Sequence, residues 1–183
     1  MVLITDEIKE KNYSFFIKKL NQFNIDTTIF EERFGEKLKN ATFNINNGGD
    51  GTLLHVIVRM LTPNAIKLSE MNPFNTNPQE LINFNKDSLI KVCLLMHISK
   101  VEMFQSGKRE GTYEYAPNPY GMKMGLRSVA LCNECNINLT TEEIEAMTIL
   151  DRENDDQAKF FSSPLAQLVK IANELTFLHI KFI

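Results

Sequence analysis

The sequence of 183 residues has no tryptophan and only three histidines and three cysteines, so residues that often carry chemistry are scarce. Serine and cysteine nucleophiles are commonly activated by a histidine beside them, and no such arrangement stands out. The cysteines, Cys93, Cys132 and Cys135, are odd in number and too few for a disulfide framework. Catalysis by a nucleophilic side chain therefore has little support in the composition.

The sequence also lacks a long apolar run and a large excess of either charge. No segment approaches the ~20 apolar residues that a bilayer-spanning helix needs. The N-terminus, MVLITDEIKEK, has acidic residues where a signal peptide is basic and then apolar. A net charge of -3 and a pI near 5.7 give no overall basic surface for nucleic acid. We therefore expect an intracellular protein with no membrane partner and no direct nucleic-acid binding.

Glycine and proline are scarce as well, with 8 and 6 residues, and no linker rich in Pro, Gly or Ser divides the chain. The content of 43% hydrophobic and 23% charged residues is ordinary for a soluble globular protein. A chain of this length buries a sizeable core within one domain. We predict a single domain over residues 1–183.

The spacing of apolar residues predicts a mainly helical, all-α domain. Asp6 is expected to cap the first helix, and Asp87 or Ser88 the third. Thr140 with Glu143 resembles a capping box ahead of a later helix. The predicted helices cover residues 6–23, 52–68, 89–98, 124–135, 141–150 and 164–177.

Other segments predict interruptions of the helical pattern. Pro63 predicts a kink or break within the second helix, whereas Pro164 suits the first turn of the last. Residues 35–47 are polar and predict irregular structure. Alternating aromatic residues predict a short hairpin or extended loop around residues 107–120.

Two segments resemble the HD-domain phosphohydrolases. Residues 89–104 read LIKVCLLMHISKVEMF, similar to the central helix in which an apolar run leads to a His-Asp doublet and a basic residue. Met96 and His97 fill the two places of the doublet, and Lys100 matches the basic residue. The string GGDGTLLHVIVRM resembles the Gly-Gly loop and helix that carry the first metal-binding histidine, here His55.

Three further segments extend the resemblance over most of the chain. PYGMKMGLRSV resembles a turn in which a His and a Glu are expected where Met124 and Leu126 stand, while Gly125, Arg127 and Ser128 keep the rest. The next two helices place Leu150 near another expected His and Asn173 where the last metal-binding Asp belongs. The resemblance implies an HD-like helical bundle with vestigial metal-site positions at His55, Met96, His97, Met124, Leu126, Leu150 and Asn173.

The replaced residues predict that the metal centre has been lost. Divalent ions in such sites bind imidazole and carboxylate groups, but Met96 offers a thioether and Asn173 a neutral carbonyl. Met and Leu at several ligand positions fit a vacated pocket that core side chains now fill. We therefore expect no catalytic residue, no metal and no cofactor.

A scaffold without its chemistry is expected to be retained for binding. The expected partners are proteins, in a homo- or hetero-oligomer. The compact size and the Asn- and Lys-rich composition suit a bacteriophage-encoded virion or tail-assembly component, located in the host cytoplasm or incorporated in the virion.

Two enzymatic alternatives remain. The first is a working metal-dependent nucleotide phosphohydrolase. The second is an NAD or lipid kinase, because GGDGTLL at residues 48–54 matches a phosphate-binding signature in which Asp50 contributes to catalysis. In this second reading residues 41–45 form a strand. A helix-entry turn with Asp50 near the N-cap accounts for the same string.

Three smaller groups have both structural and functional interpretations. Cys132 and Cys135 form Cys-x-x-Cys, which suits one face of a helix in the core better than zinc, because no second pair is present. The acids Asp151, Asp155 and Asp156 suit a solvated loop or a cation site. A further group suits either an interaction surface or a folded-back hairpin: Tyr113, Tyr115, Tyr120 and Phe104.

Overall fold

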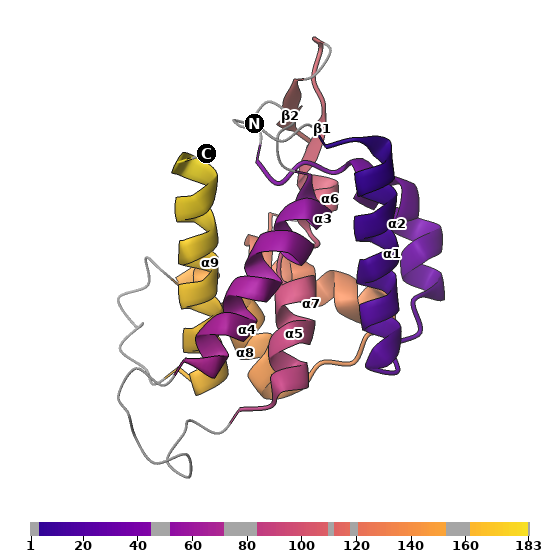
Figure 1. Ribbon diagram of the computed structural model, residues 1–183. Coiled ribbons are helices and arrows are strands. Elements are labelled where there is room, and N and C mark those ends of the chain that lie inside the picture. The colour runs from indigo at the N-terminus through magenta and orange to yellow at the C-terminus, as the bar shows by residue number, and fades with distance from the viewer. Residues whose placement is uncertain are drawn as a thin grey trace.

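The computed structural model describes residues 4–44, 52–71, 84–109, 112–117, 121–152 and 162–182. In these ranges the chain is mostly helical with one two-stranded antiparallel sheet, which confirms the predicted all-α class (Figure 1). The elements in chain order are α1 Asp6–Gln22, α2 Thr28–Asn40, α3 Leu53–Val56, the π-helix η2 Ile57–Leu61, α4 Thr62–Glu70, α5 Lys86–Leu95, α6 Lys100–Met103, β1 Phe104–Ser106, β2 Tyr113–Tyr115, α7 Met124–Glu134, α8 Thr141–Thr148, the 3-10 helix η4 Ile149–Arg152 and α9 Pro164–Phe182.

Helices α1 and α2 form an N-terminal pair on one side of the bundle (Figure 1). The cap of α1 is Thr5, whose hydroxyl accepts from the Ile8 amide at 3.4 Å, so the prediction of Asp6 as the cap is wrong. Asp6 instead lies in the first turn, where the positive end of the helix dipole stabilises its carboxylate.

Helix α2 contradicts the prediction of irregular structure for residues 35–40. Its buried residues Phe30, Phe34 and Leu38 are spaced four apart and form one apolar stripe, which the charged residues between them obscure in the sequence. Gly35 lies inside the helix because a Cβ there would be 3.0 Å from the Tyr13 hydroxyl of α1. The close approach of α1 and α2 therefore outweighs the low helix propensity of glycine.

The chain stays helical from Leu53 to Glu70, so Pro63 does not end the second predicted helix. Pro63 lies in the first turn of α4, and the preceding residues 57–61 form a π-helical turn. A π turn shifts the hydrogen bonds by one residue, and proline supplies no N–H to those bonds. The expected interruption takes the form of this widened turn, where exposed Arg59 donates to Asn12 of α1 at 3.0 Å.

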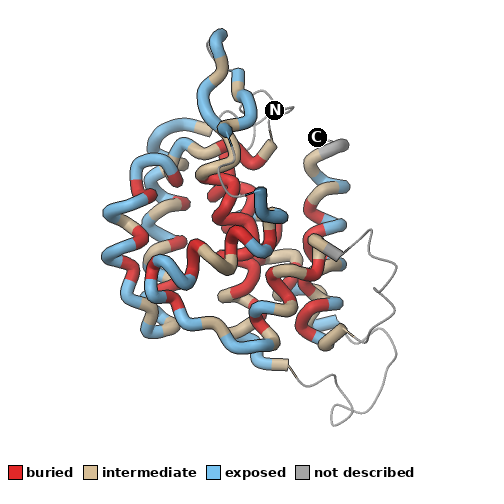
Figure 2. The backbone as a smooth tube through the Cα atoms, turned by 180° about the vertical axis from the view of Figure 1, so that it is seen from behind, coloured by how far each residue is buried: buried red, intermediate tan, exposed pale blue. Residues whose placement is uncertain are grey.

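Helix α5 crosses the middle of the bundle, and every residue from 92 to 100 is buried (Figure 2). It begins earlier than predicted, at Lys86, because the Asn85 side chain accepts from the amides of Asp87 and Ser88. Asn85 is therefore the cap, and the prediction of Asp87 or Ser88 is wrong. The helix ends at Leu95, and a turn over residues 96–99 leads into α6.

The predicted hairpin is present, and its first strand begins at Phe104, three residues earlier than expected. Phe104 pairs with Tyr115 and Ser106 with Tyr113. The rings of Phe104 and Tyr115 lie 5.4 Å apart, and Tyr115 is exposed. The hairpin extends from the end of the bundle beyond α6 (Figure 1).

The C-terminal helices follow the sequence prediction closely. Thr140 and Glu143 form the expected capping box at the start of α8. Glu143 is buried and also accepts from Lys91 of α5 at 2.9 Å, so the cap ties two helices together. Pro164 begins α9, which packs against α4 and α8.

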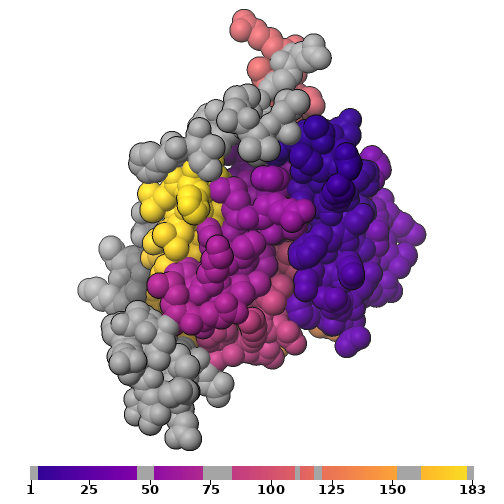
Figure 3. All heavy atoms as spheres, viewed as in Figure 1, coloured from indigo at the N-terminus to yellow at the C-terminus, as the bar shows by residue number. Residues whose placement is uncertain are grey.

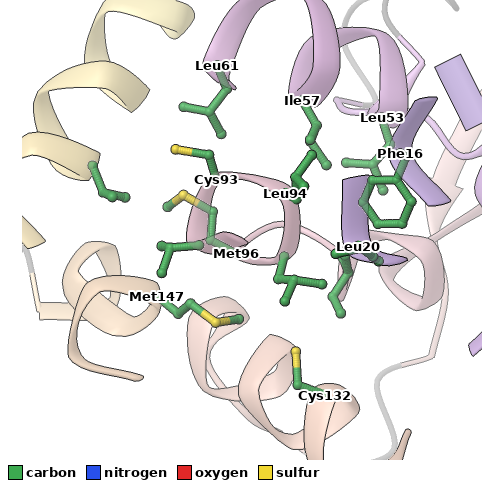
Figure 4. Close-up of a cluster of buried hydrophobic side chains, with 14 of the residues drawn as sticks. Phe16, Leu20, Leu53, Ile57, Leu61, Cys93, Leu94, Met96, Cys132 and Met147 are labelled. Carbon is green, nitrogen blue, oxygen red and sulfur yellow. The ribbon is translucent and has the colours of Figure 1, made fainter. Parts of the chain in front are cut away.

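One hydrophobic core cluster joins residues from α1 to α9. Figure 4 shows Phe16 and Leu20 of α1, Ile57 of η2, and Met96 after α5 pointing into this cluster with Met147 of α8. Within the described ranges, no helix has both the length and the apolar character that crossing a membrane requires.

Candidate functional site

A group of polar and aromatic side chains, here called the His97 cluster, lies where three segments meet. It contains Phe43 after α2, His97 and Lys100 around the turn that follows α5, and Asn173 and Phe177 of α9. His97 Nε2 lies 2.7 Å from Asn173 Oδ1, and both residues are buried. The Phe43 ring packs edge-on to the imidazole at 5.1 Å.

His97 is held as a neutral imidazole. Burial, together with the positive charge of Lys100, lowers the pKa of His97 to about 3, although the bond to Asn173 acts in the opposite direction. Because Asn173 presents its carbonyl oxygen, Nε2 carries the proton and donates it to that oxygen. Nδ1 is then an acceptor, and no described residue offers it a hydrogen-bond donor.

Lys100 is almost completely buried beside His97. Its Nζ donates to the Phe43 carbonyl oxygen at 2.9 Å and lies 3.5 Å from the centroid of the Phe43 ring. The centroid of the Phe177 ring, on α9, lies 5.7 Å from the same Nζ. Burial lowers the pKa of Lys100 to about 7, whereas contact with the two ring faces favours the charged amine.

Two serines close the turn between α5 and α6. Ser128 of α7 donates to the Met96 carbonyl at 2.9 Å, and its oxygen accepts from the Ser99 amide at 3.2 Å. Ser99 in turn donates to the Met124 carbonyl at 3.0 Å. The turn that presents His97 is therefore fixed to α7 by buried hydrogen bonds.

The other positions at which the resemblance predicts former metal ligands differ in how far they are buried. Met96 is buried in the core, as expected of a position that core has filled (Figure 4). Leu126 is 49% exposed, so the expectation that it fills a vacated pocket is wrong. Met124 and Leu150 are partly buried. Of the predicted positions, the structure joins His97 and Asn173 by a direct hydrogen bond.

His55 is partly buried in α3, and its amide donates to Thr52, the cap of that helix. Burial, and to a lesser extent the charge of Arg59, lowers the pKa of His55. Its Nδ1 is buried and finds no hydrogen-bond partner among the described residues. His55 therefore presents a second neutral imidazole nitrogen.

Asp151 has a structural role that the sequence did not indicate. Its carboxylate accepts from the Gly125 amide at 3.0 Å and the Leu126 amide at 2.8 Å, at the start of α7. Lys123 donates to the Asp151 carbonyl at 2.7 Å. The carboxylate caps a helix that begins 27 residues earlier in the chain, so the expected solvated loop is wrong for Asp151. The alternative of a cation site stays a prediction. Asp155 and Asp156 lie outside the described residues.

Arg127 of α7 forms the centre of an ion-pair network. Its guanidinium lies 2.7 Å from Glu102 of α6 and 2.6 Å from Glu134, which also pairs with Arg33 of α2 at 2.7 Å. The Arg127 side chain is buried, so these pairs are poorly screened by solvent. The network fastens α2 and α6 to α7.

Cys132 and Cys135 are both buried in the core, which agrees with the core interpretation. Burial raises the pKa of Cys132 to about 12, and also raises that of Cys135. In the part of the chain that the structure describes, no three side chains of His, Cys, Asp or Glu form a group able to hold a metal ion.

The GGDG string and Tyr120 lie outside the described residues. The chain on either side of that string is joined by a single antiparallel bridge between Thr42 and Thr52, and the Leu53 amide donates to Ala41 at 2.7 Å. Within residues 41–44 only Thr42 takes part in this pairing, so these residues do not form a strand longer than a single bridge.

Sequence reasoning named His97, Lys100 and Asn173 but missed Phe43, which contacts both His97 and Lys100. Phe43 is 57 residues from Lys100 in the chain, and its neighbours give no pattern that points to this contact.

Comparison of the chain with protein families, with curated proteins and with solved structures finds no match.

Proposed function

We propose that the protein is a catalytically inactive helical scaffold of the HD-like type that acts in protein–protein assembly. The observation that carries this proposal is the buried bond between His97 and Asn173 at 2.7 Å. The two positions that resemble metal ligands are used here to hold α9 against the turn after α5.

The electrostatics of the His97 cluster support the proposal. Asn173 supplies an uncharged carbonyl oxygen, and its hydrogen bond with His97 occupies the Nε2 atom of the imidazole. Lys100 brings an amine close enough to lower the pKa of His97, so its positive charge repels a cation. A divalent ion needs anionic oxygen or imidazole ligands to offset its charge. The cluster therefore suits internal packing better than metal-assisted hydrolysis.

A metal-dependent phosphohydrolase remains the second candidate because of one observation. Nδ1 of His55 and Nδ1 of His97 are both buried, and neither finds a partner among the described residues. A buried imidazole nitrogen with a free lone pair is a metal ligand in many proteins. His55→Gln and His97→Gln are the variants that test this candidate.

Elemental analysis of the purified protein, combined with a hydrolysis screen on nucleotides and phosphomonoesters, separates the two candidates. The scaffold predicts substoichiometric metal and no turnover above buffer, with or without added Mn²⁺, Mg²⁺ or Fe²⁺. Near-stoichiometric metal with turnover that His55→Gln abolishes would overturn the scaffold. The exposed His179→Gln is the matched control and should change nothing.

The kinase alternative is tested separately at Asp50. ATP-dependent phosphorylation of a dinucleotide or lipid that Asp50→Asn abolishes would establish it.

Assembly into a larger particle, such as a bacteriophage virion or tail, is the most specific form of the scaffold proposal. Co-sedimentation with such particles, unchanged by His55→Gln, is its expected result.

A further inference from the structure

Helix α1 carries a completely buried asparagine in the middle of its apolar side. The buried residues of α1 are Asn12, Phe16 and Leu20, spaced four apart. An amide on the apolar side of a helix costs free energy unless its polar atoms are hydrogen-bonded. Asn12 Oδ1 accepts from Arg59 Nε at 3.0 Å, but Asn12 Nδ2 is buried and has no partner among the described residues. The N–H groups of this amide are therefore unused.

Arg59 of η2 presents an unpaired positive charge above this amide. Helix α1 lies beside the segment formed by α3 and η2 at the molecular surface (Figure 3). Arg59 is exposed, and in the part of the chain that the structure describes its guanidinium has no carboxylate partner. Its Nε is used by Asn12, so the N–H groups of the two terminal nitrogens remain available. The bond to Asn12 thus orients the guanidinium and leaves its terminal edge free.

His55 of α3 lies close to the same guanidinium, four residues earlier in the chain. Burial, and then the charge of Arg59, lowers the pKa of His55, so the imidazole is neutral. Its Nδ1 is buried without a partner among the described residues. A neutral imidazole carries one N–H, and in the tautomer that places the proton on Nδ1 this atom is a donor. We call Asn12, His55 and Arg59 the Arg59 group.

The Arg59 group is a set of donors that lacks an acceptor. The two polar atoms of one amide are about 2.3 Å apart, so Asn12 Nδ2 lies within about 5 Å of Arg59 Nε. The oxygens of a carboxylate or phosphate have a similar spacing, so one oxygen can accept from the guanidinium while another accepts from the amide. The positive charge of Arg59 repels a metal cation and attracts an anion. The chemistry that completes the group is therefore that of an oxyanion.

We propose that the Arg59 group binds a small oxyanion, a carboxylate or a phosphate group. The guanidinium pairs with the anion from the solvent side, and the buried amide of Asn12 donates to a second oxygen. Because Arg59 is exposed on a long side chain, its movement admits the anion to the buried amide. Phosphate should bind more tightly than acetate because it carries more charge, with a dissociation constant of roughly 1 mM. The site goes beyond the proposed assembly role and does not depend on it.

Nitrogen-15 NMR of the full chain observes the side-chain amide of Asn12 directly. Sodium phosphate should shift the Asn12 Nδ2 resonances until they saturate, whereas sodium chloride at equal ionic strength should not. Sodium acetate tests the carboxylate, and a nucleoside monophosphate tests whether the phosphate belongs to a larger molecule. Saturation by any of these three anions supports the site, and their order of affinity identifies its ligand. No saturation by any of them up to about 50 mM, or an equal response to chloride, overturns the proposal.

Substitutions separate an anion site from a structural contact, with binding followed at the backbone amide of residue 59. Asn12→Asp keeps the shape and the acceptor for Arg59 but replaces the free donor with a charged oxygen, so phosphate affinity should fall at least about tenfold. Arg59→Gln, at an exposed residue, should have the same effect and keeps the test open if Asn12→Asp does not fold. Lys67→Gln removes an exposed positive charge from α4 and is the matched control, which should bind as wild type does. Unchanged phosphate affinity in Arg59→Gln, or in a folded Asn12→Asp, would mean that Asn12 only holds Arg59 and would overturn the proposal.

Discussion

His97 and Asn173 lie 76 residues apart in the sequence and are joined by a buried hydrogen bond of 2.7 Å. The bond connects the turn after α5 to the centre of α9, at the position where Lys100 and the Phe43 ring also meet. Through this bond the imidazole of His97 and the amide of Asn173 contribute to the packing of α9 against the turn after α5.

The neutral state of His97 should destabilise the protein in acid. Its pKa is about 3 when folded and near 6.5 when exposed, so the unfolded chain binds more protons between these values. Its contribution to the free energy of unfolding should be complete above pH 6.5 and fall by up to ~1.4 kcal/mol per pH unit below it. His97→Gln keeps a donor for Asn173 and does not titrate. Urea denaturation at pH 4–7 should show a shallower acid loss for this variant, whereas His179→Gln should follow wild type. Parallel curves for wild type and His97→Gln would contradict a neutral buried imidazole.

The burial of Lys100 should make the stability of the protein depend on pH in the alkaline range. Its folded pKa is about 7 and its ordinary value 10.5, so the unfolded chain binds more protons between them and stability should rise with pH through this window. At pH 6 the buried charge is costly, and Lys100→Met should raise the free energy of unfolding by ~1–3 kcal/mol after loss of the Phe43 contacts. Above pH 10 the gain should disappear. Chemical denaturation at pH 6, 8 and 10 measures both effects, with the exposed Lys67→Met of α4 as the control. A loss of stability at pH 6 would mean that the aromatic contacts outweigh desolvation.

Removal of Arg127 should be costly because Glu102 loses its ion pair with the guanidinium and Glu134 keeps only its pair with Arg33. Glu102 and Glu134 both pair with its buried guanidinium. Arg127→Gln should lower the free energy of unfolding by ~2–4 kcal/mol, and Arg127→Lys should recover only part, since lysine cannot bond both acids in the same planar geometry. Lys11→Ala removes an exposed pair with Glu7 and should cost less than ~0.5 kcal/mol. Equal effects of Arg127→Gln and Lys11→Ala would show that the buried network is not a strong tie.

Asp151 should contribute to stability as a distant helix cap. Asp151→Ala leaves the amides of Gly125 and Leu126 without an acceptor and should cost ~1–2 kcal/mol. Asp151→Asn retains one acceptor oxygen and should cost less. Glu32→Ala, an exposed acid on α2, should stay within ~0.5 kcal/mol of wild type. Thermal unfolding followed by circular dichroism ranks the three variants. An order other than Ala, Asn and then the Glu32 control would argue against the capping role.

Local patterns determined most of the helices in advance. The capping box of Thr140 and Glu143, the start of α9 at Pro164 and the hairpin near Tyr113 depend on residues a few positions apart, so the sequence was sufficient to predict them. Helix α2 was missed although Phe30, Phe34 and Leu38 have helical spacing, because a glycine and several charged residues interrupt the stripe. Its stability comes from packing on α1 rather than from propensity.

The sequence by itself determined which faces of the helices are apolar and where several of them begin, because these features arise from repeat spacing and from hydrogen bonds within one turn. Only the tertiary structure decided that His97 meets Asn173, that Lys100 lies against the Phe43 ring and that Asp151 caps α7. Each of those contacts joins residues at least 25 positions apart, and it depends on how whole helices pack rather than on any local preference. The same packing buried Met96 and left Leu126 in solvent, although both are apolar residues at positions where the resemblance placed metal ligands.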